Sequence, residues 1–391
     1  MSKEEKNMVV PELRFPEYIS DTLWNQAILG EISEIVRGGS PRPIEEYITN
    51  EQSGLNWLKI GDVSSDSKYI TSTKEKVIPA ALNKTREVNP GDLILSNSMS
   101  FGRPYILKIK TCIHDGWIAI TKIKDGVSKD YLYYFILTPA SQVYFLNYSA
   151  GSGVQNLNAD IIKLLQVAIP KYPEQQKIAS CLSSLDDLIT AHTQKLDALK
   201  AHKKGLMQQL FPAEGEKVPK LRFKEFEGSG EWEEKILGDC LTNHPEYGLN
   251  APAVPYSKDL PTYLRITDIS EEGLFLKDDK VSVDKDVTAG NYLEDGDIVL
   301  ARTGASVGKS YKYRNEDGRL VFAGFLIRVK PDEKKLVSEL LYQFLFTDRY
   351  WKWVAFTSQR SGQPGINGNE YASLKIPLPP TKSEQLKISS C

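Results

Sequence analysis

The chain has 391 residues, of which 41% are hydrophobic and 26% are charged, as expected for a soluble globular protein with room for two domains. Its formal net charge of −2 argues against a protein that coats nucleic acid, although a local basic face remains open. A polar N-terminal stretch and the absence of long apolar runs exclude a secretory signal and a membrane span. Cys112, Cys181, Cys240 and Cys391 lie far apart, which predicts free thiols in a reducing cytoplasm.

Read in order, the chain repeats itself at an offset of about 205 to 210 residues. The matched segments are 10–15 with 218–223, 57–64 with 263–270, 90–95 with 295–300, 131–138 with 340–347, and 157–158 with 366–367. Because these matches keep one order and nearly one offset, we predict a tandem repeat of a single unit of about 200 residues.

Each copy has the pattern of a mixed domain. Short apolar runs bounded by Gly, Asp and Pro, such as 57–60, 92–96 and 117–123, predict strands. An aromatic helix, a polar Gly/Ser loop, a last strand and a long helix follow. The predicted class is therefore α+β, with two tandem domains of mixed sheet plus helices.

Residues 173–211 predict one long helix that joins the two domains. Pro173 suits its first turn, and Pro212 ends it. Aliphatic residues recur at the a and d positions of a heptad, which predicts packing along a partner helix in a coiled coil. These heptad residues are Ile178, Leu182, Leu185, Ile189, Leu196, Leu199, Leu206 and Leu210.

The predicted boundaries are 1–172 for the first domain, 173–211 for the spacer helix, 212–382 for the second domain and 383–391 for the start of a second spacer helix. Cys391 matches Cys181, after which the first copy continues to the end of its long helix. We therefore expect that most of the second spacer helix is absent from this chain. Two equal units joined by such helices would be related by a pseudo-twofold axis. Two half-sites on duplex DNA match this symmetry.

The ordered pieces of the chain resemble the specificity subunits of type I restriction–modification systems. The pieces are 36–42 before 57–62, then 91–95, 151–158, 169–178 and 203–212. The resemblance implies two target-recognition domains, each reading one half of a split site in double-stranded DNA. It also implies a spacer that docks two modification (methyltransferase) subunits and, through them, restriction subunits. Those partners are expected to use S-adenosylmethionine, and ATP with Mg, whereas this chain needs no cofactor.

Polar loop residues at matched places are the predicted DNA contacts. Arg and Lys suit phosphates or guanine edges, and Asn and Gln suit adenine. The candidates are Arg37, Ser40, Arg42, Lys59, Asn97, Arg103, Gln155 and Asn156 in the first copy, and Arg265, Arg302, Lys309, Arg360 and Gln363 in the second. Residues 243–248 are expected to take the place of 37–42 in the second copy. Solvated turns explain the same loops, so both interpretations stay open.

The sequence predicts no chemistry in the chain itself. Residues 304–310 resemble a phosphate-binding loop, but the spacing is one residue short. The four histidines have no metal-ligand spacing, and neither an amino-methyltransferase motif nor a Ser/His/Asp motif is present. The alternative function is a coiled-coil scaffold with two protein-binding domains.

The heptad residues generate a first prediction. Exposed aliphatic rows associate with a partner, so the isolated chain should self-associate antiparallel through 173–211 or be poorly soluble without modification subunits. Light scattering at high concentration measures this, and a clean monomer would refute it.

Overall fold

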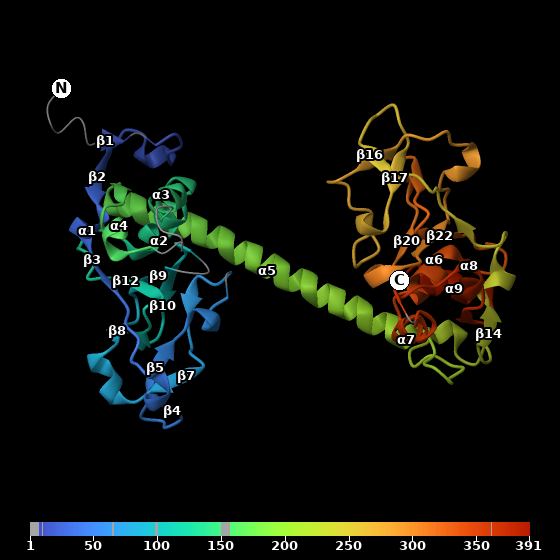
Figure 1. Ribbon diagram of the computed structural model, residues 1–391, viewed down its shortest axis with the longest axis horizontal. Coiled ribbons are helices and arrows are strands. Elements are labelled where there is room, and N and C mark those ends of the chain that lie inside the picture. Colours follow the sequence, from blue (N-terminus) through green and yellow to red (C-terminus); the bar gives the residue numbers. More distant parts are fainter. Residues whose placement is uncertain (1–7, 10, 65, 98–100, 150–156, 361) are drawn as a thin grey trace. The chain divides into compact units, whose positions relative to one another are not determined.

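The computed structural model describes residues 8–9, 11–64, 66–97, 101–149, 157–360 and 362–391. The chain divides into unit 1 (Met1–His192), coloured from blue to green, and unit 2 (Thr193–Cys391), coloured from green through yellow to red (Figure 1). Within the described ranges, no helix is both long enough and apolar enough to cross a bilayer.

In the described part of unit 1, the strands form three sheets. The first has the order β1 (Met8–Val9), β2 (Trp24–Ile28), β13 (Gln166–Ile169). The second, the central sheet, has the order β3 (Glu34–Arg37), β12 (Trp117–Thr121), β9 (Leu93–Ser96), β10 (Pro104–Leu107), β6 (Tyr69–Ile70). The third, the outer sheet, has the order β4 (Ile48–Thr49), β7 (Glu75–Val77), β5 (Leu55–Leu58), β11 (Thr111–Ile113), β8 (Arg86–Val88).

Alternation along β9 shows why the central sheet holds unit 1 together. Successive side chains of a strand point to opposite faces. Leu93 and Leu95 pack in the core with the helices, whereas Ile94 packs with Leu58 and Ile113 of the outer sheet. All three β9 leucine and isoleucine side chains are fully buried. The central sheet is therefore covered on both faces.

In the described part of unit 2, the strands form three corresponding sheets in the same order, each with one strand fewer than in unit 1. Its first sheet pairs β14 (Glu233–Ile236) with β23 (Lys375–Leu378). Its central sheet has the order β15 (Glu246–Tyr247), β22 (Leu326–Val329), β19 (Ile298–Ala301), β20 (Ser310–Lys312). Its outer sheet has the order β16 (Ala253–Pro255), β18 (Val281–Val283), β17 (Thr262–Leu264), β21 (Leu320–Phe322). The predicted α+β class and tandem repeat are confirmed.

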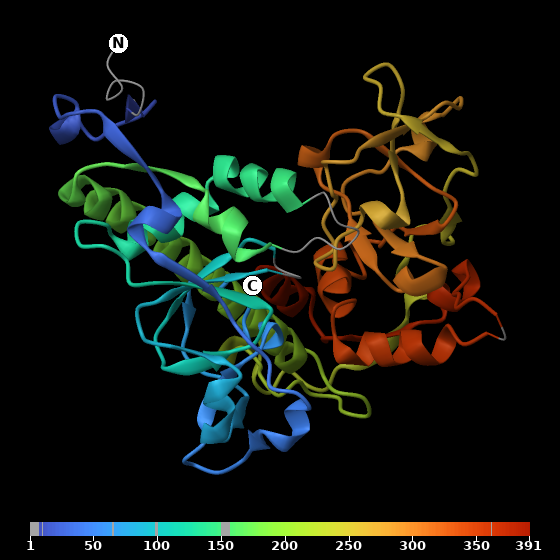
Figure 2. The ribbon, with the colours of Figure 1, turned by 60° about the vertical axis from the view of Figure 1, so that its left-hand side comes forward.

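The helices also correspond between units. Those of unit 1 are α1 (Leu29–Ile32), α2 (Lys129–Leu137), α3 (Pro139–Ser149) and α4 (Ala159–Lys163), with α4 beside α1 and α3 (Figure 2). Those of unit 2 are α6 (Ser338–Phe344), α7 (Asp348–Thr357), α8 (Gly368–Ala372) and α9 (Lys382–Ser389). Of these, α6, α7 and α8 correspond to α2, α3 and α4, and α9 corresponds to the start of α5. Asn158 caps α4 and Asn367 caps α8, each accepting a hydrogen bond from the backbone three residues on. This cap explains the repeated Leu-Asn/Ile-Asn motif.

A single helix, α5 (Tyr172–Leu210), joins the units over 39 residues. Its sequence-based bounds were 173–211. At 1.5 Å per residue, a helix of this length measures roughly 58 Å. Its beginning is buried in unit 1 through Glu174, Gln175 and Ala179, and its last residue, Leu210, is buried in unit 2.

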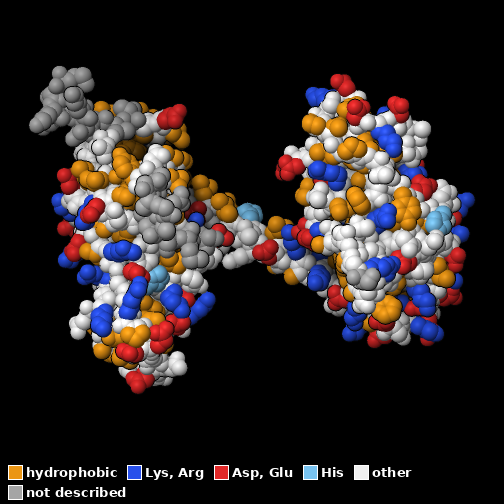
Figure 3. Space-filling view, in the orientation of Figure 1, with side chains coloured by type: hydrophobic (Ala, Val, Ile, Leu, Met, Phe, Trp, Pro, Cys, Tyr) orange, Lys and Arg blue, Asp and Glu red, His pale blue; other side chains and the backbone are white. Residues whose placement is uncertain are grey.

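The heptad residues do not all belong to one interface with a partner helix. Leu210 is 5% exposed and belongs to the core of unit 2, with Leu206 packed against that core. Ile178 packs against the core of unit 1 in the same way. The assignment of these three residues to a partner helix is therefore corrected, because the domain cores cover both ends of α5. The exposed heptad residues are Leu182, Leu185, Ile189, Leu196 and Leu199, and hydrophobic side chains reach the surface along α5 (Figure 3).

Buried ion pairs fix the start of α5 to unit 1 and the start of α9 to unit 2. The Arg14 guanidinium donates from Nε and Nη2 to the two Glu174 carboxylate oxygens, at 2.7 Å each. Arg222 makes the same pair with Glu384, at 2.8 Å each. Both glutamates are almost fully buried. These contacts explain why Leu-Arg-Phe and Glu-Gln recur in the two copies.

The Arg222–Glu384 pair generates a stability prediction. Arg222→Ala leaves a buried carboxylate without its partner and should destabilise unit 2 by about 3–5 kcal/mol. The matched control is Lys217→Ala, since the Lys217–Glu231 pair is exposed and its loss should cost much less stability. Urea unfolding measures both changes. Equal losses in the two variants would contradict the role assigned to the buried pair.

Candidate nucleic-acid interface

Each unit has a hollow at the rim of its two larger sheets. Hollow 1, of about 670 Å³, is lined among others by Ser40, Arg42, Trp57, Lys59 and His114. Hollow 2, of about 730 Å³, is lined among others by Tyr247, Arg265, Arg302, Gly324 and Phe325. The structure thus brings three predicted residues together in unit 1 and two in unit 2.

Strand register shows that the hollows occupy matched places. Arg37 pairs with Ile118 across β3 and β12, and Tyr247 pairs with Ile327 across β15 and β22. Ile118 and Ile327 have matched partners on β9 and β19. The counterpart of 37–42 is therefore 247–252, and the sequence-based placement at 243–248 is wrong. Hydrogen bonding between strands fixes this register, whereas the two loops share little sequence.

One glycine is required in both loops. A Cβ on Gly38 would lie 2.1 Å from the carbonyl oxygen of His114, and one on Gly248 would lie 2.3 Å from those of Phe322 and Ala323. Both contacts are with backbone atoms, which cannot move aside. Each loop therefore crosses directly over the neighbouring turn, where only glycine fits.

Asp115 lies beside hollow 1, joined to its lining residue Ser40, and it is not among the residues predicted from the sequence. Its side chain accepts a hydrogen bond from Ser40 Oγ at 2.6 Å. Its backbone carbonyl accepts from Arg37 Nε at 2.9 Å and from Asn97 Nδ2 at 2.8 Å. The Ser40 hydrogen bond lowers the pKa of Asp115 below its usual value. The available signal is the Asp-Gly turn directly before the predicted strand 117–123.

Asn97 therefore has a different place from the predicted DNA contact. Its side chain is 1% exposed and donates a hydrogen bond to the Asp115 backbone carbonyl, which stabilises the turn. Its counterpart in the repeat is Arg302, since the backbone N–H groups of both residues donate to the matched turns, at Gly116 O and Phe325 O. The same position supports the turn in unit 1 and faces hollow 2 in unit 2.

His114 closes the back of hollow 1 beside Trp57, with ring centroids 6.1 Å apart. Its ring nitrogens lie 3.2 Å from the backbone nitrogen of Ile60 and 2.7 Å from that of Gly116. Burial lowers the pKa of His114, and the neighbouring Asp115 opposes this effect. The imidazole is thus uncharged near neutral pH and lines one side of hollow 1.

The matched cations Lys59 and Arg265 begin equivalent turns. Their backbone N–H groups donate to Asp62 and Asp268, at 3.0 and 2.8 Å. Arg265 also pairs through its side chain with Asp268, and Lys59 pairs with Glu75. Internal carboxylates therefore offset both charges, which weakens long-range attraction of phosphate at these two places.

Hollow 2 presents aromatic surface and a guanidinium. The Arg302 guanidinium lies 5.0 Å from the centroid of the Tyr247 ring, within cation–π range. Arg302 Nη1 donates to the Gly324 carbonyl at 3.4 Å. Among the described residues, no carboxylate forms an ion pair with Arg302. Its charge is therefore available to an anionic or acceptor-rich ligand.

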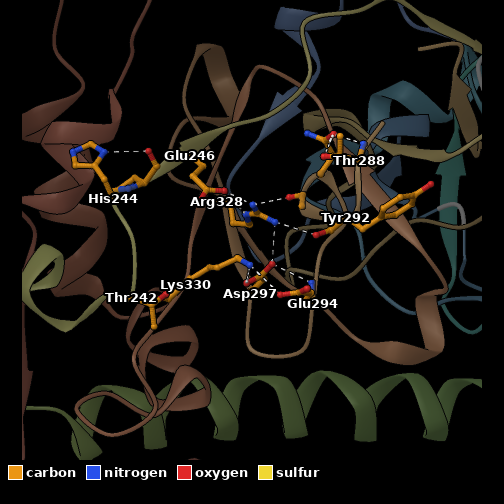
Figure 4. A network of polar contacts seen from close by, with 12 residues as sticks. Thr242, His244, Glu246, Thr288, Tyr292, Glu294, Asp297, Arg328 and Lys330 are labelled. Atoms are coloured by element: carbon orange, nitrogen blue, oxygen red, sulfur yellow. Dashed lines mark hydrogen bonds and ion pairs between the residues drawn. The ribbon is translucent and has the colours of Figure 1, made fainter. Parts of the chain in front are cut away.

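A polar network behind hollow 2 fixes the strand that carries Tyr247 (Figure 4). Arg328, which is buried, donates from Nε to Glu246 Oε2 at 3.0 Å and from Nη1 to the Tyr292 carbonyl at 3.0 Å. Arg328 and Lys330 both lie near Asp297, whose pKa is raised by burial. The network joins β15 to β22, and in unit 1 the corresponding strand pair is apolar, Val36 with Ala119.

The other candidates lie outside the hollows. Arg103 lies over the Tyr105 ring, Lys309 pairs with Glu271, and Arg360 pairs with Glu370. Gln363 is exposed beside Gly304. Gln155 and Asn156 fall outside the described residues. Within the described ranges, no three His, Cys, Asp or Glu side chains are grouped as metal ligands. DNA contact by all these candidates stays a prediction.

Comparison with known proteins identifies one family. The model of the type I restriction modification DNA specificity domain matches residues 22–201 and 231–391. The MjaVIII specificity subunit of Methanocaldococcus jannaschii, a type I restriction enzyme subunit, is 22% identical over 96% of this chain and 86% of that subunit. The MjaIX specificity subunit of the same organism is 28% identical over 59% of this chain, and the match spans 54% of that subunit's length.

Solved structures show the same fold. The type I restriction–modification S subunit from M. genitalium aligns over 98% of this chain and 91% of its own, with a TM-score of 0.59 and 14% identity. A chain from a study of complex assembly and conformational transition of the type I system aligns over 97% and 90%, with a TM-score of 0.53 and 15% identity.

The Ser40–Asp115 contact can be tested by a double-mutant cycle. Each single change to Ala removes the same hydrogen bond, so the pair should couple by about 1–2 kcal/mol. Urea unfolding of the four proteins measures the coupling. Asp160→Ala combined with Ser40→Ala is the matched control, because Asp160 is exposed and pairs with Lys163. Additive Ser40 and Asp115 effects would contradict the contact.

Proposed function

The chain belongs to the family of type I restriction–modification DNA specificity subunits, and on this premise we propose that each unit reads one half of a split DNA site through its hollow. The observation that carries this proposal is the pair of matched hollows with different linings. A common scaffold places Ser40 and Arg42 in hollow 1, with the Asp115 carboxylate hydrogen-bonded to Ser40 beside it, and Arg302 with aromatic rings in hollow 2. Two readers of different sequences require this combination.

The lining residues are expected to make two kinds of contact with DNA. Phosphate contacts position a protein on duplex DNA, and contacts to base edges specify the sequence. The Arg42 side chain is 83% exposed at the rim of hollow 1, so it suits a phosphate or a guanine edge. The Asp115 carboxylate suits the amino group of cytosine or adenine. Arg302 suits the O6 and N7 atoms of guanine.

We propose that α5 docks two modification subunits and, through them, restriction subunits, in the cytoplasm. Leu182, Leu185, Leu196 and Leu199 support this proposal because they are exposed aliphatic residues on one helix. Catalysis then belongs to the partners, which would use S-adenosylmethionine, and ATP with Mg. Antiparallel self-association of the isolated chain would use the same exposed leucines. The scaffold alternative is not favoured, because the family match covers both units.

Methylation mapping tests the function. The chain is co-purified with its modification subunits, the complex is incubated with DNA and methyl donor, and methylated adenines are mapped. We expect a split motif with a fixed unread gap. A complex that forms but methylates without sequence preference would contradict the proposed function.

Variants then assign the half-sites. Arg302→Ala should weaken discrimination in one half-site about tenfold, the value of one good base contact, and leave the other half unchanged. Arg42→Ala should act on the opposite half. Lys217→Ala, which removes an exposed cation outside both hollows, is the matched control. Loss in both halves from either single variant would contradict separate reading.

A further inference from the structure

The turn Ala323–Leu326 at the rim of hollow 2 is rigidly held by its backbone. The Gly324 N–H donates to the Leu249 carbonyl at 2.8 Å, and the Leu326 N–H donates to the Ala323 carbonyl at 2.8 Å. The Phe325 carbonyl accepts from the Arg302 N–H at 3.0 Å. The position of Phe325 is therefore set by hydrogen bonds and not by burial of its ring.

The Phe325 side chain is 61% exposed beside two other exposed or partly exposed groups, Tyr247 and Arg302. Single exposed apolar residues are common. A rigid aromatic beside a second ring and a guanidinium, at the edge of a hollow, is instead the composition of a binding hot spot.

Unit 1 shows that the fold does not need this ring. Leu326 pairs with Ala301, and its counterpart Trp117 pairs with Ser96 at the matched place. The residue before Trp117 is Gly116, so the same turn forms in unit 1 with no side chain at the position of Phe325. An aromatic residue that the scaffold can replace by glycine, and that remains exposed, is available for a ligand.

Duplex DNA offers one apolar group at its base edges in the major groove, the 5-methyl group of thymine. The charge of Arg302, which pairs with no carboxylate of the described residues, matches the negative potential of DNA. Resting on the function proposed above, we propose that Phe325 packs against the 5-methyl group of a thymine in the half-site read by unit 2. Arg302 then engages the neighbouring base pair or its phosphate.

The test replaces each thymine of the mapped half-sites by uracil, which removes only the methyl group. Affinity is measured for the complex of the full chain with its modification subunits. With the wild-type chain, one replacement in the unit 2 half-site should weaken binding about fourfold, the value of one buried methyl group. With Phe325→Ala, binding to the thymine duplex should be about tenfold weaker, and that replacement should have no further effect.

Phe356→Ala is the matched control, because Phe356 is 79% exposed in unit 2 and lies outside hollow 2. It should keep the wild-type response to uracil, and Phe325→Leu, which retains an apolar side chain, should keep part of it. Unchanged recognition of the unit 1 half-site by Phe325→Ala shows that the variant is folded.

Three results would overturn the inference. One is that the response to uracil in the unit 2 half-site is the same with and without Phe325. Another is a half-site for unit 2 that contains no thymine on either strand. The third is loss of modification subunits from Phe325→Ala at unchanged DNA affinity, which would assign the ring to a protein contact. Failure of the proposed function is distinct, because the wild-type complex would then select no split site at all.

Discussion

The buried pair between an arginine and a glutamate, at the start of α5 in unit 1 and of α9 in unit 2, is the constraint on which each unit depends. A carboxylate removed from water is tolerated only when a partner charge and further hydrogen bonds satisfy it. Arg14 supplies two such bonds to Glu174, and Trp24 Nε1 supplies a third at 3.2 Å. The N-terminal segment, the first sheet and the helix must therefore form together.

The residue next to each glutamate extends this constraint to the rest of the unit. Gln175 accepts a hydrogen bond from the Ser128 N–H at the start of α2, and Gln385 accepts one from the Val337 N–H at the start of α6. Since α2 and α6 pack on the central sheets, the Glu-Gln dipeptide connects the start of α5 to the core of unit 1 and the start of α9 to the core of unit 2. The loops at the rims of hollows 1 and 2 take no part in these hydrogen bonds and can therefore differ between the units.

Local sequence predicted the features that depend on local chemistry. The repeat, the α+β class and the existence of the long helix follow from periodicity, capping residues and breakers, and they are present in the structure. The features that the sequence did not predict depend on contacts between distant segments. The register that places Tyr247 opposite Ile327 and the burial of Leu210 depend on segments distant in the chain. The role of Asp115 also required the structure, because its donors come from three separate loops or strands.

The comparison of the two units separates stability from recognition at single positions. Gly38 and Gly248 are the same because a Cβ would strike the backbone of the neighbouring turn in both units. Two residues of that neighbouring turn differ completely, Asp115-Gly116 in one unit and Gly324-Phe325 in the other, although the hydrogen bond that the turn accepts from the N–H group of Asn97 or Arg302 is retained. The turn can therefore exchange a carboxylate for an aromatic ring without rebuilding the sheets. A fold of this kind can change what it recognises while the interactions that hold it together stay constant.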